Sequence, residues 1–172
     1  EGNFSATLEG NHAKVPALSW RVQGTYKRGG NVRSPNYWQK NTGVEEGDFS
    51  AALGWKKENY GIEIFYSRFQ TKLGILSTSH TGNLTDLNRA IASPVPLETS
   101  GFTYNIGRPY QDVSHDMLKA RAYLQTGKAG NLDVVFAWQY NVRKEYDKHL
   151  PYNNLLAKQN LPGFQFQIQT LT

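Results

Sequence analysis

The sequence predicts an all-β fold of about seven antiparallel strands, and two patterns support this prediction. First, apolar and polar residues alternate with a period of two over stretches of roughly nine to twelve residues, as in strands whose faces meet different environments. Second, the connections between these stretches are alternately tight and long. Because alternate connections of an up-and-down sheet lie at opposite ends, we expect all tight turns at one end and all long loops at the other.

The first four predicted strands cover 4–9, 18–27, 49–56 and 60–71. In the second strand, apolar or small residues occupy the even positions from Leu18 to Tyr26, and polar residues occupy the odd positions. The first and third strands show the same separation. The fourth is the least regular, because Phe65 and Phe69 share a face with Glu63. All four segments nevertheless favour strands with two different faces.

The last three predicted strands cover 118–125, 132–143 and 164–169. The alternation is strongest in 132–143, and the final segment places Phe164, Phe166 and Ile168 opposite three glutamines. Tight turns are expected over 14–17, 57–59 and 127–131, and long loops over 29–47, 72–112 and 148–163. Inside the second long loop we expect a short helix over 86–92, with Thr85 as its N-cap.

Strand length and aromatic placement favour a membrane-spanning barrel over a soluble sandwich. Ten residues tilted by about 45° cover roughly 23 Å, close to the apolar band of an outer-membrane barrel. Aromatic residues fall near both ends of the apolar face, where amphipathic rings favour lipid headgroups, and small residues lie between them. At the two ends these residues are Trp20, Trp55 and Tyr60, and Tyr26, Phe49, Tyr66 and Tyr140.

Composition excludes several other classes of protein. No run of 18 apolar residues is present, so a transmembrane helix is excluded, and without cysteine there can be no disulfide or thiolate metal site. The net charge of +5 comes from scattered basic residues, which does not favour nucleic acid. Seven strands would leave an open sheet in lipid, so we expect 1–172 to be part of a larger barrel domain.

Several runs in the loops and strand ends are distinctive: SWRVQGTYKRGGN (19–31), SPNY (34–37), NTG (41–43), YSRF (66–69), GNLTDL (82–87), RPYQDVSH (108–115) and QYNVRKEYD (139–147). Together they resemble barrel segments of TonB-dependent outer-membrane receptors, particularly those of the Bacteroidetes. The resemblance implies an interior portion of a 22-stranded up-and-down transmembrane β-barrel with long extracellular loops. The plug domain and the closing strands of that family are absent from 1–172.

The resemblance also implies a function in the bacterial outer membrane. Such receptors take up a scarce nutrient, such as a ferric chelate (siderophore), cobalamin or an oligosaccharide, with energy delivered by TonB. The implied partners are outer-membrane lipid, the plug domain and remaining strands, TonB through the plug, and the cargo.

Eight charged residues on the polar sides of the strands are expected to face the lumen. A basic residue on the lipid face would cost roughly 2–4 kcal/mol at the bilayer midplane, so their inward direction is required whatever the cargo. They could attract anionic cargo, or they could neutralise one another or contact the plug. These residues are Arg21, Lys27, Lys56, Glu63, Lys119, Arg121, Asp133 and Arg143.

Six loop residues are candidates for ligand contact: Arg33, Asn36, Tyr37, Trp38, Arg108 and Tyr110. Aromatic rings with polar tips suit sugars or chelates, whereas the alternative role is packing within the loops. No metal-ligand spacing and no nucleophile motif occurs, so neither a cofactor nor an enzyme is expected. Two other functions remain open, namely a soluble antiparallel sandwich that binds carbohydrate or protein through its loops, and a non-transporting outer-membrane scaffold or adhesin.

Overall fold

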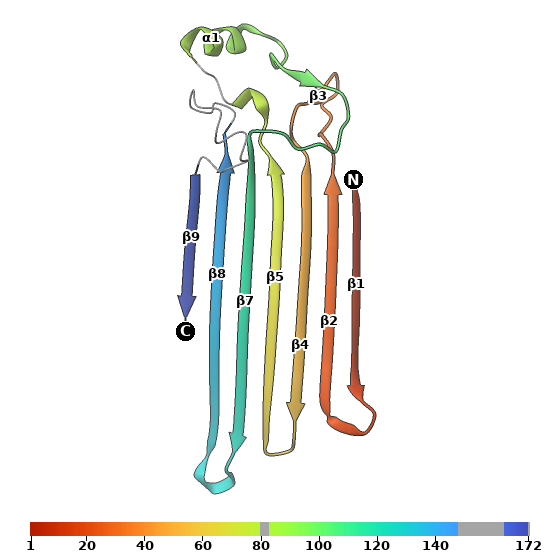
Figure 1. Ribbon diagram of the computed structural model, residues 1–172, viewed down its shortest axis with the longest axis vertical. Helices are drawn as coiled ribbons and strands as arrows, with labels where there is room; N and C mark the ends of the chain where they lie inside the picture. The colour runs from red at the N-terminus through yellow and green to blue at the C-terminus, as the bar shows by residue number, and fades with distance from the viewer. Residues whose placement is uncertain (80–82, 148–163, 172) are drawn as a thin grey trace, which may run out of the picture.

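The computed structural model describes residues 1–79, 83–147 and 164–171, and its main element is one seven-stranded antiparallel sheet (Figure 1). The strand order is β1-β2-β4-β5-β7-β8-β9, so each long strand lies beside its neighbours in sequence. The bounds are β1 Gly2–His12, β2 Val15–Gly29, β4 Val44–Lys56, β5 Tyr60–Gly74, β7 Tyr110–Gln125, β8 Asn131–Tyr146 and β9 Phe164–Leu171. The predicted all-β class and the seven antiparallel strands are confirmed.

The connections separate as predicted. Tight turns join β1 to β2, β4 to β5 and β7 to β8 at one end of the sheet, which we call the turn end (Figure 1). The last of these contains the 3₁₀ turn η2, Gly127–Ala129. Long loops leave the opposite end, which we call the loop end. The predicted loop over 148–163 lies outside the described residues.

The strands extend further toward the loop end than the sequence predicted. β5 continues to Gly74 and β7 begins at Tyr110, although 72–112 was expected to be loop. Toward the loop end, the side of β5 and β7 that is apolar further down carries polar pairs such as Gln70 with Ser114 and Lys72 with Asp112. The hydrophobic alternation therefore ends before the backbone pairing does.

The described parts of the long loops contain four short elements. β3 (Trp38–Gln39) and β6 (Thr99–Ser100) pair as a second, two-stranded sheet that joins the first long loop to the second. The 3₁₀ turn η1 spans Ser77–Ser79, and α1 spans Leu84–Ala92. No helix among the described residues is long and apolar enough to cross a membrane.

The start of α1 differs from the prediction that Thr85 is its N-cap. The cap is Asn83, whose side-chain oxygen accepts a hydrogen bond from the backbone N–H of Asp86 at 2.8 Å. Asparagine is a stronger N-cap than threonine. Thr85 therefore lies in the first turn of the helix.

Candidate functional site

The two faces of the seven-stranded sheet differ in chemistry. The register places all eight predicted lumen residues on one face, here called the polar face. Five of them take part in four ion pairs: Arg21 with Glu9 (2.8 Å), Lys27 with Glu1 (3.7 Å), Arg121 with Asp133, and Arg143 with Glu145 (2.6 Å). Within the described ranges, Lys56, Glu63 and Lys119 make no ion pair. Most of these charges are therefore neutralised on their own face.

The opposite face, here called the apolar face, carries three adjacent rows of apolar, aromatic or small residues. A row means the residues that the register places side by side on one face. These residues are exposed or half-buried, with Leu53 at 56% and Phe136 at 42% exposure, and no described segment packs over them as a second layer. The rows are Leu18-Trp55-Ile62-Ala122-Val134, then Gly10-Trp20-Leu53-Ile64-Ala120-Phe136, then Leu8-Val22-Ala51-Tyr66-Leu118-Trp138-Leu171.

This apolar band crosses the sheet obliquely. Toward the loop end its last apolar residue is Tyr26 on β2, but on β5 and β7 it is Tyr66 and Leu118, two rows lower. The edge thus falls by two rows, about 13 Å along the strands, between β2 and β5, and it is level from β5 to β7. β8 departs from this trend, because Tyr140 and Val142 continue its apolar side.

The lower edge of the band is inclined in the same direction. On β1 the last large apolar residue toward the turn end is Leu8, whereas β7 and β8 continue for three further rows to Leu124 and Leu132. A membrane cuts tilted strands at constant height, and strands of transmembrane barrels tilt by about 35–45°. From β2 to β7 both edges therefore descend in the same direction.

Most apolar residues of β9 lie on the opposite face of the sheet from the apolar residues of the neighbouring strands. Its register sets Phe166 opposite Arg143 and Gln167 opposite Val142, so Phe164, Phe166 and Ile168 lie on the polar face. Alternation alone fixes which residues of a strand share a face, but only the register fixes which face that is. The glutamines of β9 lie above the apolar band, and Leu171 enters the band beside Trp138.

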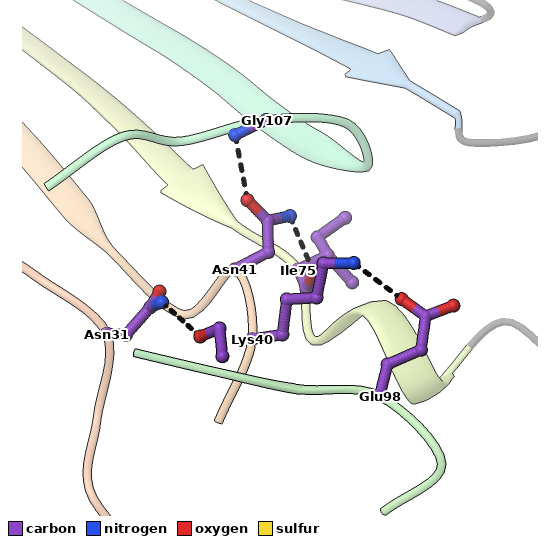
Figure 2. Close-up of polar contacts among 7 residues, drawn as sticks. Asn31, Lys40, Asn41, Ile75, Glu98 and Gly107 are labelled. Atoms are coloured by element: carbon purple, nitrogen blue, oxygen red, sulfur yellow. Dashed lines mark hydrogen bonds and ion pairs between the residues drawn. The ribbon is translucent and has the colours of Figure 1, made fainter. Parts of the chain in front are cut away.

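Two buried asparagines hold the loop end together (Figure 2). The side-chain nitrogen of Asn41 donates to the carbonyl oxygens of Ile75 (2.9 Å) and Pro109 (2.6 Å), and its side-chain oxygen accepts from Gly107 N–H (2.9 Å). Asn41 has φ of 63°, a left-handed conformation that asparagine tolerates better than most residues. One side chain thus joins the first long loop to both ends of the second.

Asn31 makes a second connection between the same loops. Its side-chain nitrogen donates to Ser100 Oγ at 2.8 Å and to the Gly101 carbonyl at 3.2 Å, while its side-chain oxygen accepts from Thr42 N–H at 3.1 Å. Lys40 adds an ion pair with Glu98 at 3.0 Å (Figure 2). The loops therefore form one connected structure rather than two independent excursions.

This connected structure presents an aromatic cluster. Phe102 contacts Trp38 and Tyr104 edge to face, with ring centroids 5.2 and 5.0 Å apart. Arg33 lies over the Trp38 ring (5.6 Å) and Arg28 over the Tyr104 ring (5.1 Å). Phe102 is 49% exposed and Tyr104 is 40% exposed. Exposed rings beside guanidinium groups can bind planar, aromatic or sugar-like ligands.

The candidate loop residues thus have different surroundings. Arg33 and Trp38 belong to the aromatic cluster, whereas Asn36 is exposed beside it, and Tyr37 accepts a hydrogen bond from Ser34 N–H through its carbonyl oxygen. Sequence reasoning missed Phe102 and Tyr104, although their alternation in 102–104 is a strand-like signal. It also missed Asn31 and Asn41, whose partners are distant in sequence.

Arg108 and Tyr110 belong to a separate stack at the ends of β7 and β8. The Tyr110 and Tyr146 rings are parallel within 15°, with centroids 4.2 Å apart, and both residues are buried. Lys72 lies over the outer face of this stack at Tyr110, and Arg108 lies over the Tyr146 ring. Burial raises the pKa of Tyr146. This packing favours the anchoring role for both candidates.

Comparison with protein-family models, with curated proteins and with solved structures found no match. Among residues 1–79, 83–147 and 164–171, no group of three or more histidine, aspartate or glutamate side chains is placed to hold a metal ion. The resemblance to TonB-dependent receptors therefore stays a prediction, and the chemistry of the two faces and of the loop end is the basis for a functional proposal.

Proposed function

We propose that this chain forms part of the wall of an outer-membrane barrel of the TonB-dependent receptor type, which takes up a scarce nutrient. The observation that carries the proposal is the apolar band, which no described segment covers and whose edges descend from β2 toward β7. Acyl chains would cover this band, and the polar face with its ion pairs would line a water-filled lumen. Further strands, up to the 22 of that family, would close the barrel.

The alternatives explain fewer of these observations. A soluble sandwich needs a second layer over the apolar rows, and the described residues form none. A non-transporting scaffold barrel would share the band, but it would not need an exposed aromatic cluster at the loop end.

The aromatic cluster supports capture of a small cargo at the extracellular side. Trp38, Phe102 and Tyr104 provide apolar area, and Arg33 provides positive charge beside it. Ferric chelates, cobalamin and oligosaccharides each offer planar or ring surfaces for such a site. TonB would act through the plug domain of the complete receptor.

Membrane exposure can be tested with single cysteines, because the chain has none of its own. Leu53→Cys places a label on the apolar face, and Ala52→Cys places the same label on the polar face, one residue away on β4. In bilayers of brominated lipid, bromine should quench a fluorophore at position 53 and leave one at position 52 largely unquenched. Equal quenching at the two positions would contradict the proposal.

Cargo uptake is tested in cells that carry the intact receptor. Uptake of ferric chelates, cobalamin and oligosaccharides should be compared with and without a functional TonB. The proposal expects TonB-dependent uptake of one of these three classes, and a complete absence of TonB-dependent uptake would leave the scaffold as the better function.

A further inference from the structure

The loop-side edge of the apolar band carries one arrangement twice, and its first copy lies on β2 and β4. Tyr26 and Arg28 follow one another on the apolar face of β2, and Glu45 lies directly opposite Arg28 on β4. The Tyr26 hydroxyl donates to the Glu45 carboxylate at 3.2 Å. Arg28 is exposed and lies against the Tyr104 ring, 5.1 Å from its centroid.

The second copy lies on β5 and β7. Tyr66 and Arg68 follow one another on the apolar face of β5, and Asp116 lies directly opposite Arg68 on β7. The Tyr66 hydroxyl donates to the Asp116 carboxylate at 2.7 Å, and an Arg68 guanidinium nitrogen lies 3.6 Å from the same carboxylate oxygen. The Arg68 side chain is 50% exposed. The order of the groups matches the first copy: a tyrosine and, one row beyond it, an arginine directly opposite a carboxylate on the next strand.

The two copies are displaced from one another in the same way as the edge of the band. Arg68 lies two rows lower than Arg28, and Tyr66 lies two rows lower than Tyr26. The band edge also descends by two rows between β2 and β5. Measured from that inclined edge, both tyrosines therefore mark the end of the apolar surface, and both arginines are the first charged groups beyond it.

This arrangement suits a lipid headgroup that carries a phosphate. A tyrosine at the edge of a band has its ring among apolar groups and its hydroxyl at the polar boundary, which is where such rings are favoured. The planar guanidinium presents paired donors that match the oxygens of a phosphate. The Asp116 carboxylate holds Arg68 at the surface and the Tyr104 ring holds Arg28, and the exposed part of each guanidinium remains open to an anion.

We infer that Arg28 and Arg68 bind phosphate groups of lipid headgroups in the outer leaflet, with Tyr26 and Tyr66 packing beside the same lipids. This inference rests on the proposed function, because it requires the apolar band to lie in a bilayer. It adds a specific lipid contact, made by two side chains that face away from the lumen and therefore take no part in passage of cargo through it.

The test measures lipid selectivity of the full-length receptor in phosphatidylcholine vesicles, using spin-labelled phosphatidic acid and spin-labelled phosphatidylcholine. The native protein should immobilise both lipids and prefer phosphatidic acid. The double variant Arg28→Gln with Arg68→Gln should lower this preference, by about fivefold for each arginine. Arg28→Lys with Arg68→Lys keeps the charge but loses the paired donors, so its preference should be intermediate.

The matched control is Lys27→Gln with Arg143→Gln, which removes two positive charges from the polar face near the same end of the sheet. Its preference should equal that of the native protein. Two results would overturn the lipid contact but not the proposed function. One is an equal loss of the preference for phosphatidic acid in both double glutamine variants, at positions 28 and 68 and at positions 27 and 143. The other is an unchanged preference in the variant at positions 28 and 68. If the native protein immobilises no lipid at all, the proposed function fails together with the inference.

Discussion

A single asparagine determines much of the loop end. Asn41 offers three hydrogen-bonding groups to backbone partners at positions 75, 107 and 109, and it does so from a left-handed backbone conformation. A shorter or apolar side chain would leave these partners without their hydrogen bonds in a buried place. The position therefore has two separate requirements, one on the backbone and one on the side chain.

We predict that Asn41→Ala destabilises the loop end by roughly 1–3 kcal/mol for the lost hydrogen bonds, with roughly 1–2 kcal/mol more for the strained backbone. Asn41→Gly should lose only the first part, because glycine adopts positive φ readily. The measurements are the melting temperature in detergent micelles and the rate of proteolytic cleavage within 98–109. Asn36→Ala, at an exposed asparagine of the same loop, should change neither; equal effects at positions 36 and 41 would contradict this role.

The aromatic cluster yields a prediction about cargo. Phe102 lies at its centre, in contact with both Trp38 and Tyr104. Phe102→Ala should weaken cargo binding by about 2–12-fold, the loss expected for an aromatic contact of roughly 0.5–1.5 kcal/mol. Binding is measured by titration of the receptor with the cargo identified by uptake. Ile91→Ala, at an exposed residue of α1, is the control, and an unchanged affinity for Phe102→Ala would assign the ring to packing.

At the scale of the element, the alternation predicted where the strands lie but not where they end. For β9 it also did not predict which face of the sheet most of the apolar residues occupy. The segment 132–143 could be identified because every second residue is apolar, whereas the loop-side ends of β5 and β7 could not, because Lys72 and Asp112 interrupt the pattern. The facing of β9 depends on its pairing with β8, which its sequence does not encode alone.

The site was less predictable than the strands for a related reason. Arg33 and Trp38 could be selected as candidates from the sequence. Phe102 joins them only through the pairing of β3 with β6. Asn41 and Pro109 are 68 residues apart. Local patterns contain no signal for contacts of this length.

Because the two faces differ, the stability cost of introducing a lysine should depend strongly on which face of the strand the residue occupies. Ala51→Lys, on the apolar face of β4, should cost roughly 2–4 kcal/mol in a bilayer, as for a basic residue at midplane. Ser50→Lys, one residue away on the polar face, should have little effect. Unfolding of the full-length barrel by denaturant from lipid vesicles measures both, and similar losses at positions 50 and 51 would argue against a lipid-facing band.

At the scale of the whole molecule, the exposed apolar rows predict how the isolated chain behaves. The 172-residue chain should not give a monodisperse, cooperatively melting species in plain buffer, because apolar patches of this extent cause association in water. It should become monodisperse in detergent micelles, as measured by light scattering. A compact monomer with a sharp melting transition in buffer alone would contradict the assignment of these rows to lipid.

The unequal lengths of the connections also have a kinetic consequence. The turn between β4 and β5 contains only residues 57–59, whereas residues 75–109 join β5 to β7. Closing the longer loop costs about 2 kcal/mol more in chain entropy, since the cost rises with the logarithm of loop length. Separate hairpins should therefore form first, from the pairs β1–β2, β4–β5 and β7–β8. These hairpins should associate with one another later. Assembly of this sheet would then proceed in units of two strands, each led by its tight turn.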